Sequence, residues 1–192
     1  MKLIQNKNFN HKKLNDENFE SIIFKKIFIK FTEIKNKKFI NCNFVDVDFG
    51  ETDIIDCRFL NCNFSNCQMF HTNFKNCTFE NINASDFDLR AGLLIKNNFI
   101  KCNFFNSCFR GSKLTENNIN NLKVNNCDMK NIIFESNNYT ETSFSYSNLF
   151  KSMFKNENLK TLELKSCNTF LCIFNKTSGL EILDVDKYSI IN

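Results

Sequence analysis

The strongest constraint on the fold is a ladder of apolar residues with a spacing of five. Every fifth residue from Ile4 to Leu164 is apolar, and most of them are Phe, Leu or Ile. On an α-helix, five residues turn by about 500°, so successive members would spiral around the helix and share no face. On a flat strand, an odd spacing would place them on alternate faces. The spacing therefore predicts a chain that turns a corner about every five residues, which is a solenoid.

Length and composition indicate one globular domain. The chain has 192 residues, of which 42% are hydrophobic and 24% charged, enough for a substantial core. The net charge of +4 is mild, so the pattern of charge matters more than the sum. The first residues hold no apolar stretch of a signal peptide, and no run approaches the roughly 18 apolar residues of a membrane span. We therefore expect a single cytoplasmic domain over residues 1–192 that does not enter a membrane.

The ten cysteines are predicted to be structural. Nine of the ten lie two residues before a ladder position, and Cys108 is the exception. Thr, Ser and Val fill the same slot elsewhere, so the slot selects for small size, and free Cys behaves as a small buried hydrophobe. Without a secretory signal, a reducing compartment is expected. The pattern favours buried thiols over disulfides or a metal site, and we expect no metal and no cofactor.

Written around its central residue, the repeating unit reads small–Asn/Asp–Phe/Leu–polar–polar. Examples are the segments 42–46, 57–61, 62–66 and 147–151. This unit resembles the pentapeptide-repeat family over nearly the whole chain. The resemblance implies an all-β fold, a right-handed quadrilateral β-helix in which four units close each coil. We expect about eight to nine coils with no inserted loops, regular from about residue 4 to 174, and a C-terminal cap or dimerisation tail over 175–192.

In such a coil, the central residue and the small residue two positions before it point inward. Residues four units apart are then stacked at about 4.8 Å, the spacing of paired strands. One predicted stack consists of Phe19, Phe39, Phe59, Phe79, Phe99, Ile119, Tyr139 and Leu159. A second consists of Phe24, Phe44, Phe64, Ala84 and Phe104. Stacked aromatic rings bury a large area, which explains the 24 Phe residues without a ligand.

Residues 84–97 break the size rule. Ala84 is a small central residue, and Phe87 is a large residue in a small slot. Phe87 could fill the space that Ala84 leaves, or the repeat could change frame locally, because residues 85–87 also read as a unit. We favour compensation, because the frame continues at Phe99. Asn117 and Asn137 are also expected to point inward, where their amides need hydrogen-bond partners.

The sequence shows no arrangement of residues that is typical of an enzyme active site. The two histidines, His11 and His71, have no thiol arranged beside them as a nucleophile, and His71 falls on an outward position. Four glycines cannot build a phosphate-binding loop. We therefore predict a protein without catalytic residues.

The end of the chain departs from the repeat. The frame fails at Gly179, after which apolar residues follow a different pattern. A terminal coil needs a cap or a partner, because its exposed strand edge invites association. By resemblance to quinolone-protecting relatives, we predict a homodimer through this end. The candidate cap and dimer residues are Leu180, Ile182, Leu183, Val185, Tyr188, Ile190 and Ile191.

The outer faces carry any remaining function. Family members of the Qnr, MfpA and McbG type protect DNA gyrase and topoisomerase IV, with acidic faces proposed to mimic DNA. The resemblance makes these enzymes the most concrete partner, and a general interaction scaffold is the alternative. In this sequence every face mixes charge signs, so an acidic stripe is not expected, nor direct nucleic-acid binding. The candidate interaction surface consists of the apolar residues expected to point outward, namely Phe28, Phe31, Phe70, Phe150, Phe170, Ile40, Leu60 and Ile100.

Overall fold

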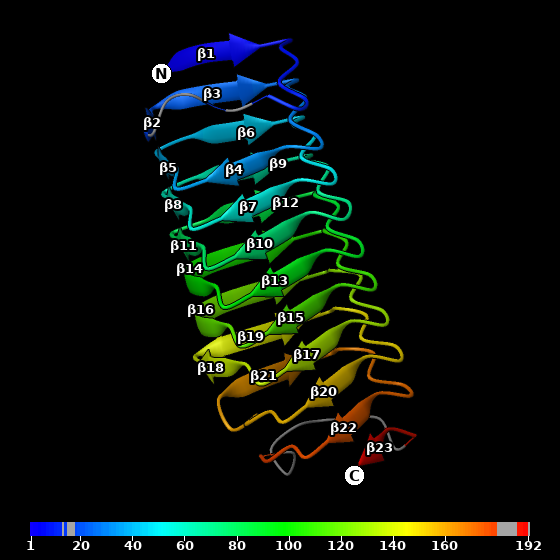
Figure 1. Ribbon diagram of the computed structural model, residues 1–192. Coiled ribbons are helices and arrows are strands. Elements are labelled where there is room, and N and C mark those ends of the chain that lie inside the picture. Colours follow the sequence, from blue (N-terminus) through cyan, green and yellow to red (C-terminus); the bar gives the residue numbers. More distant parts are fainter. Residues whose placement is uncertain (13, 15–17, 180–187, 192) are drawn as a thin grey trace.

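The structure is a computed structural model that describes residues 1–12, 14, 18–179 and 188–191. Figure 1 shows short strands stacked one above another from the N-terminal end to the C-terminal end. All strand pairs are parallel, and partners lie four repeat units apart along almost the whole chain, as in Phe39 with Phe59. The chain is therefore a four-sided parallel solenoid with one coil per four units, as the sequence predicts.

We number the four faces in chain order from Ile4. Face 1 contains β1 (Lys2–Gln5), β3 (Ile22–Lys25), β6 (Asn43–Val45), β9 (Asn63–Ser65), β12 (Asn83–Ser85), β19 (Thr142–Ser145) and β21 (Leu162–Lys165). Face 4 contains β2 (Asn18–Glu20), β5 (Lys38–Ile40), β8 (Arg58–Leu60), β11 (Thr78–Glu80) and β18 (Asn138–Thr140). The longer strands β14 (Asn98–Phe105) and β16 (Asn118–Asn125) run from face 4 onto face 1 and join these faces into one 14-stranded sheet.

Face 3 is a separate 9-stranded sheet. Its strands are β4 (Glu33–Lys35), β7 (Asp53–Ile55), β10 (Asn73–Lys75), β13 (Leu93–Ile95), β15 (Lys113–Thr115), β17 (Ile133–Glu135), β20 (Met153–Lys155), β22 (Ile173–Asn175) and β23 (Ile190–Ile191). Face 2 has single parallel bridges instead of strands, running from Asn8–Phe28 to Asn148–Asn168. The coil is therefore asymmetric, with three faces built from strands and one face held by bridges.

The corners require a left-handed backbone. Nearly every fifth residue from Asn6 to Lys176 has a positive φ, between 48° and 58° for the non-glycine residues. This conformation costs an ordinary residue roughly 1–2 kcal/mol, and Asn and Asp adopt it most readily. Asn or Asp accordingly occupies many corners, and successive corner amides bond to one another, as from Asn81 Nδ2 to Asn61 Oδ1 at 2.9 Å.

The core consists of stacked rings, as predicted. On face 4, the ring centroids of Phe39 and Phe59 lie 4.9 Å apart with 7° between their planes, and those of Phe59 and Phe79 lie 5.1 Å apart. On face 1, Phe44 and Phe64 stack at 4.7 Å. The predicted face 4 stack continues in register to Tyr139. Leu159 is buried but lies outside the strand pairing of that face, which ends at β18 among the described residues.

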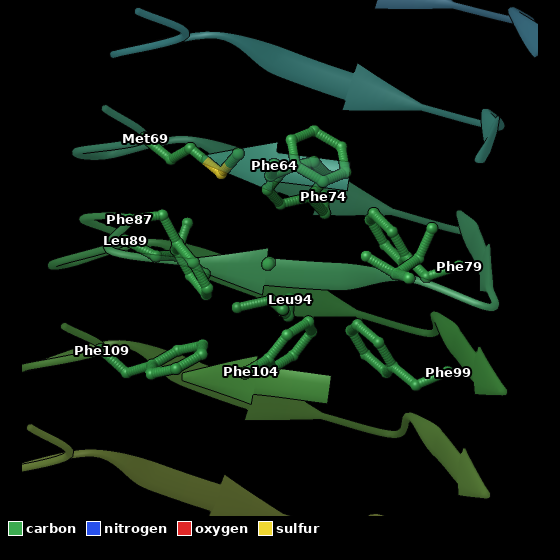
Figure 2. Close-up of a pocket in the computed structure, with 12 residues that line it drawn as sticks. Phe64, Met69, Phe74, Phe79, Phe87, Leu89, Leu94, Phe99, Phe104 and Phe109 are labelled. Carbon is green, nitrogen blue, oxygen red and sulfur yellow. The ribbon is translucent and has the colours of Figure 1, made fainter. Parts of the chain in front are cut away.

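At residues 84–97 the frame is intact, so a local frame change is wrong. Ala84 pairs in register with Phe64 and Phe104, and Phe87 is buried in the small slot. The Phe87 ring meets Phe104 edge-on at 5.5 Å. Compensation is incomplete, because an apolar cavity of about 40 Å³ remains beside Ala84. Figure 2 shows Phe87 and Leu89 on one side of this space and Phe79 and Phe99 on the other.

The two ends are built differently from the middle. In the first coil, Lys2, Lys7 and Lys12 occupy small slots and are exposed, while the central residues Ile4 and Phe9 are only partly buried. At the other end the repeat persists slightly further than expected, because Ser178 still bridges to Asn158. Gly179 has φ +80° and would bring a Cβ within 2.6 Å of the Lys160 nitrogen, so this position needs glycine. The strand β23 then pairs with β22 at the last rung of face 3.

Candidate functional site

Most of the thiols are enclosed in the core, where eight of the ten cysteines are buried. Hydrogen bonding with Cys62 lowers the pKa of the buried Cys42 thiol, whereas burial raises the pKa of other thiols. Burial raises the pKa of Cys67 to about 12 and that of Cys102 to about 11, so both thiols stay protonated at neutral pH. Each buried thiol points to backbone carbonyls, as Cys67 does to the Phe44 oxygen at 3.5 Å. The small-slot prediction is confirmed for the buried set, while Cys167 and Cys108 are partly exposed.

A column of buried polar side chains runs along the inside of face 4. It consists of Asn97, Asn117, Asn137 and Glu157, one residue per coil. Asn97 Nδ2 donates to Asn117 Oδ1 at 3.1 Å, and Asn117 Nδ2 donates to Asn137 Oδ1 at 2.9 Å. Asn137 Nδ2 donates in turn to Glu157 Oε1 at 3.0 Å. The amides predicted to need partners therefore find them in one another and in backbone groups.

Glu157 ends this column and is only 2% exposed. Its two carboxylate oxygens also accept the Asn137 backbone N–H at 3.1 and 3.2 Å. Burial raises the pKa of this carboxyl to about 7, although the hydrogen bonds from Asn137 oppose the rise. The sequence analysis did not predict that Glu157 is buried. The indication was its position: it lies 20 residues after the inward Asn137 and two residues before the ladder residue Leu159. Because the carboxyl is enclosed in the core, it can stabilise the coil but cannot reach a substrate.

Outside the core, the first candidates for chemistry are the two histidines. His11 and His71 are exposed, as expected. His11 stacks on Phe31 at 5.1 Å, and His71 meets the Phe70 ring edge-on at 4.0 Å. No group of three or more His, Cys, Asp or Glu side chains within residues 1–12, 14, 18–179 and 188–191 could hold a metal ion. Those same residues also contain no helix able to span a membrane.

The predicted aromatic residues of face 2 do point outward. Phe28, Phe31 and Phe70 are 50%, 44% and 42% exposed. Phe150 and Phe170 are partly exposed and stack on each other at 6.0 Å. These residues form three separate groups, because Gly50 lies between the first group and Phe70, and charged residues lie between Phe70 and Phe150. Face 2 therefore carries aromatic clusters and not one continuous strip.

The predicted apolar residues of face 4 are also interrupted. Ile40 pairs with Leu60, but Leu60 and Ile100 are separated by Glu80 in the same column. Glu80 accepts a hydrogen bond from the Arg58 guanidinium at 2.8 Å, and all three apolar residues are only partly exposed. This column is therefore a short apolar pair with one outlying residue.

A larger apolar surface, missed at the sequence level, wraps the corner between faces 2 and 3 near the C-terminal end. We call it the corner patch. Its face 3 column contains Ile133, Met153, Ile173 and Ile190, which are successive register partners. Its face 2 column contains Phe150, Phe170 and Tyr188, whose last two rings meet at 5.3 Å. The sequence does contain this pattern, because Ile133, Met153 and Ile173 each lie one position before a central Phe and are 20 residues apart.

The predicted C-terminal cap residues are only partly covered by the structure. Leu180, Ile182, Leu183 and Val185 lie outside the described residues. Ile191 pairs through its backbone with Phe174. Tyr188 and Ile190 are 55% and 48% exposed, so these two side chains are available at the surface of a single copy.

Charged side chains of both signs lie on the outer faces. Most ion pairs link neighbouring coils, including Arg110 with Asp128 at 2.5 Å and Arg58 with Glu80 at 2.8 Å. Glu135 is held by Lys113 and Lys155, both at 2.6 Å, and these hydrogen bonds lower the pKa of its carboxyl to about 2. Such pairs neutralise charge locally on faces 2, 3 and 4.

Comparison with known proteins identifies the repeat. The family described as "Pentapeptide repeats" matches residues 42–81 in eight copies. Residues 42–81 are therefore pentapeptide repeats. The match covers the most regular coils, and the pentapeptide register continues on both sides of it through the parallel pairing of successive coils. The expected right-handed quadrilateral β-helix is confirmed.

The solved structure of a pentapeptide-repeat protein supports the same fold. HetL, a protein involved in heterocyst differentiation regulation from the cyanobacterium Nostoc, is 12% identical and gives a TM-score of 0.60, over 92% of this chain and 87% of HetL. QnrB1, a plasmid-mediated fluoroquinolone resistance protein, is 13% identical with a lower TM-score of 0.38, over 99% of this chain and 93% of QnrB1. Comparison with curated protein sequences gave no match. At this identity the likeness to HetL concerns the fold alone.

Proposed function

We propose that this pentapeptide-repeat protein is a non-enzymatic, rigid rod that binds another protein through its outer faces. One observation carries the proposal: eight of the ten thiols are enclosed in the core, while aromatic and aliphatic side chains stand on outward positions. Outward apolar groups that gather into patches are typical of protein-binding surfaces. A coil closed by ring stacks and corner hydrogen bonds holds these groups at fixed spacing, which lowers the entropic cost of binding.

The most concrete partner is DNA gyrase or topoisomerase IV. Three features support it: the rod architecture, the charged irregular first coil, and the short apolar C-terminal segment that resembles those of quinolone-protecting family members. Mixed surface charge distinguishes this chain from an acidic DNA mimic, so contact with a topoisomerase would depend on the apolar clusters. We also propose a cytoplasmic protein, supported by a core that contains eight buried cysteines, that dimerises through its C-terminal end.

A supercoiling assay tests the topoisomerase proposal. Gyrase is incubated with relaxed plasmid and ciprofloxacin, with and without this protein from nanomolar to micromolar concentration. Restored supercoiling, or inhibition without the drug, is the expected result. No effect over that range would remove the topoisomerases as partners and leave the general scaffold. Light scattering at the same concentrations checks the dimer, whose expected mass is twice 22.6 kDa.

The scaffold without a topoisomerase link is the second candidate, and the mixed charge favours it. Lys30 with Asp48, Lys96 with Glu116 and Arg90 with Asp88 lie at 3.8, 3.4 and 2.6 Å. Because each of these pairs places opposite charges side by side, it provides no long-range attraction for a strongly charged partner. Such a surface recognises its partner mainly by short-range contacts at its apolar clusters.

A further inference from the structure

The corner patch gathers seven outward apolar side chains in two columns on neighbouring faces. Its seven residues come from the last coils, around β17, β20, β22 and β23 near the C-terminal end in Figure 1. Strand register places the four aliphatic residues one above another, and the three rings of the neighbouring column contact in sequence from coil to coil. Each column is continuous over several coils, unlike the isolated aromatic groups near the other end.

The border of the patch is basic. Lys130 and Lys151 lie beside the aromatic column, and Lys155 and Lys176 lie on the far side of the aliphatic column. Lys151 sits over the Phe150 ring at 5.1 Å. Among the described residues, Lys130, Lys151 and Lys176 make no ion pair, and the one acidic neighbour on face 3, Glu135, is already bound by two lysines. The border therefore offers positive charge to a partner.

We infer that the corner patch is a docking site for an amphipathic helix with acidic flanks on a partner protein. This inference rests on the proposed function, because it assigns a partner chemistry to the same protein-binding rod. Apolar side chains of the helix would cover the aliphatic and aromatic columns. Carboxylates on its two flanks would meet Lys151 on one side and Lys176 on the other.

The dimensions of the patch match a short helix. From Ile133 to Ile190 the aliphatic column crosses three steps between rungs, or about 14 Å at the spacing of paired strands. Three turns of an α-helix span about 16 Å, and residues at i, i+4 and i+7 present one face at a similar interval. A sheet face with apolar residues in one column is a surface on which a helix can pack its apolar stripe.

The border charge also argues against a second copy as the occupant. In a two-fold dimer the same patch meets itself, so the lysines of one copy would face the lysines of the other. Like charges brought together at an interface weaken it and slow association. A complementary acidic partner gains from the same lysines. The proposed dimer would accordingly use the end of the rod, and the corner patch would stay free on its side.

Two helical peptides, each about five turns long, test the site. Both carry a Leu stripe at helical spacing and a fluorescent label; one has Glu on its flanks and the other has Lys. Anisotropy is measured against the full chain and three variants, Ile173→Ser, Lys151→Glu and the matched control Phe70→Ser, an exposed ring on face 2 outside the patch. The Glu peptide is expected to bind the full chain. Ile173→Ser and Lys151→Glu are each expected to weaken binding about tenfold, equivalent to about 1.4 kcal/mol, and Phe70→Ser less than about twofold.

Three results would overturn the inference. They are no anisotropy change for the Glu peptide up to about 1 mM, equal binding of the Lys peptide, and equal loss of binding in Phe70→Ser and Ile173→Ser. Binding to phosphatidylglycerol vesicles without peptide binding would assign the patch to a membrane surface instead. A dimer abolished by Ile173→Ser would assign it to a second copy. If the protein protects gyrase but does not bind the Glu peptide, the docking inference fails and the proposed function stands. If it binds the peptide but has no effect on gyrase, the docking inference stands and only the topoisomerase partner is excluded.

Discussion

The inside of face 4 changes character halfway along the rod. In the upstream half, the small slot holds Cys57 and Cys77 beside an unbroken Phe stack. In the downstream half, the same slot holds Asn97, Asn117 and Asn137 and ends at Glu157. The backbone pairing is the same in both halves, with partners on successive coils. One coil geometry is therefore stabilised by two different kinds of interior.

The two halves should differ in what they tolerate. Ring stacks gain stability from buried apolar area, which is non-directional and sensitive mainly to volume. A buried amide column contributes stability only while every donor and acceptor is paired. Substitutions in it are therefore costly when they remove a hydrogen-bonding atom, even if the volume of the side chain hardly changes. The comparison predicts that the upstream half responds to truncation, and the downstream half to the loss of a polar atom and to pH.

The largest effect is expected from truncation in the Phe stack. Phe59 is fully buried between Phe39 and Phe79, and Phe59→Ala should lower the free energy of unfolding by about 3–5 kcal/mol, since it removes a ring and leaves a cavity. Lys75→Ala, on an exposed position of the neighbouring face, should change it by less than about 0.5 kcal/mol. Urea denaturation measures both. Equal midpoints for the two variants would contradict the inward assignment of the ladder.

The polar column should make stability depend on pH. The pKa of Glu157 is raised by burial from 4.5 to about 7, so between these values the folded chain keeps a proton that the unfolded chain has lost. Stability contributed by this group therefore falls as pH rises through that window, by about 3 kcal/mol in total. Glu157→Gln keeps an oxygen for Asn137 but cannot ionise. It should match the parent near pH 4.5 and exceed it by about 3 kcal/mol at pH 8, whereas a difference constant with pH would refute the assignment.

A third prediction compares substitutions at the same inward position of face 4, one in each half of the rod. Asn117→Ala removes the acceptor of the Asn97 side chain and the donor to the Leu94 carbonyl at 2.9 Å, so buried groups lose their partners. The expected cost is about 2–3 kcal/mol. Cys77→Ala removes one weak donor and should cost about 1 kcal/mol. Chemical denaturation of both variants provides the test, and a cost for Cys77→Ala as large as that for Asn117→Ala would remove the distinction between the halves.

The sequence was sufficient for the fold because the repeat is redundant. Each ladder position has partners on the coils before and after it, so one exception such as Ala84 cannot shift the register. Single-residue events were harder to foresee. Glu157 occupies the slot of small residues, and nothing local distinguishes its buried carboxyl from an exposed one; only its place after three inward Asn residues does.

The candidate surface was predictable only in part. Counting outward positions found Phe150 and Phe170, but it did not find Met153 and Ile173, because they belong to another unit of the repeat. These residues lie on either side of a corner, where proximity depends on how two neighbouring faces of the coil are oriented. The repeat period predicts which residues are neighbours on the preceding and the following coil. Which residues are neighbours around a corner can be decided only from the three-dimensional structure of the coil.

The smallest predicted effect concerns the boundary region, where Ala84 and Phe87 exchange the usual large and small positions. Ala84→Val should fill much of the remaining cavity of about 40 Å³ and raise the unfolding free energy by about 1 kcal/mol. Ala84→Phe should instead destabilise by about 1–3 kcal/mol, because its ring would compete with Phe87 for the same space. The double variant Ala84→Phe with Phe87→Cys restores the ordinary unit and should recover that loss. Additive effects in this double-mutant cycle would show that Phe87 does not compensate for Ala84, since residues that share a cavity must couple.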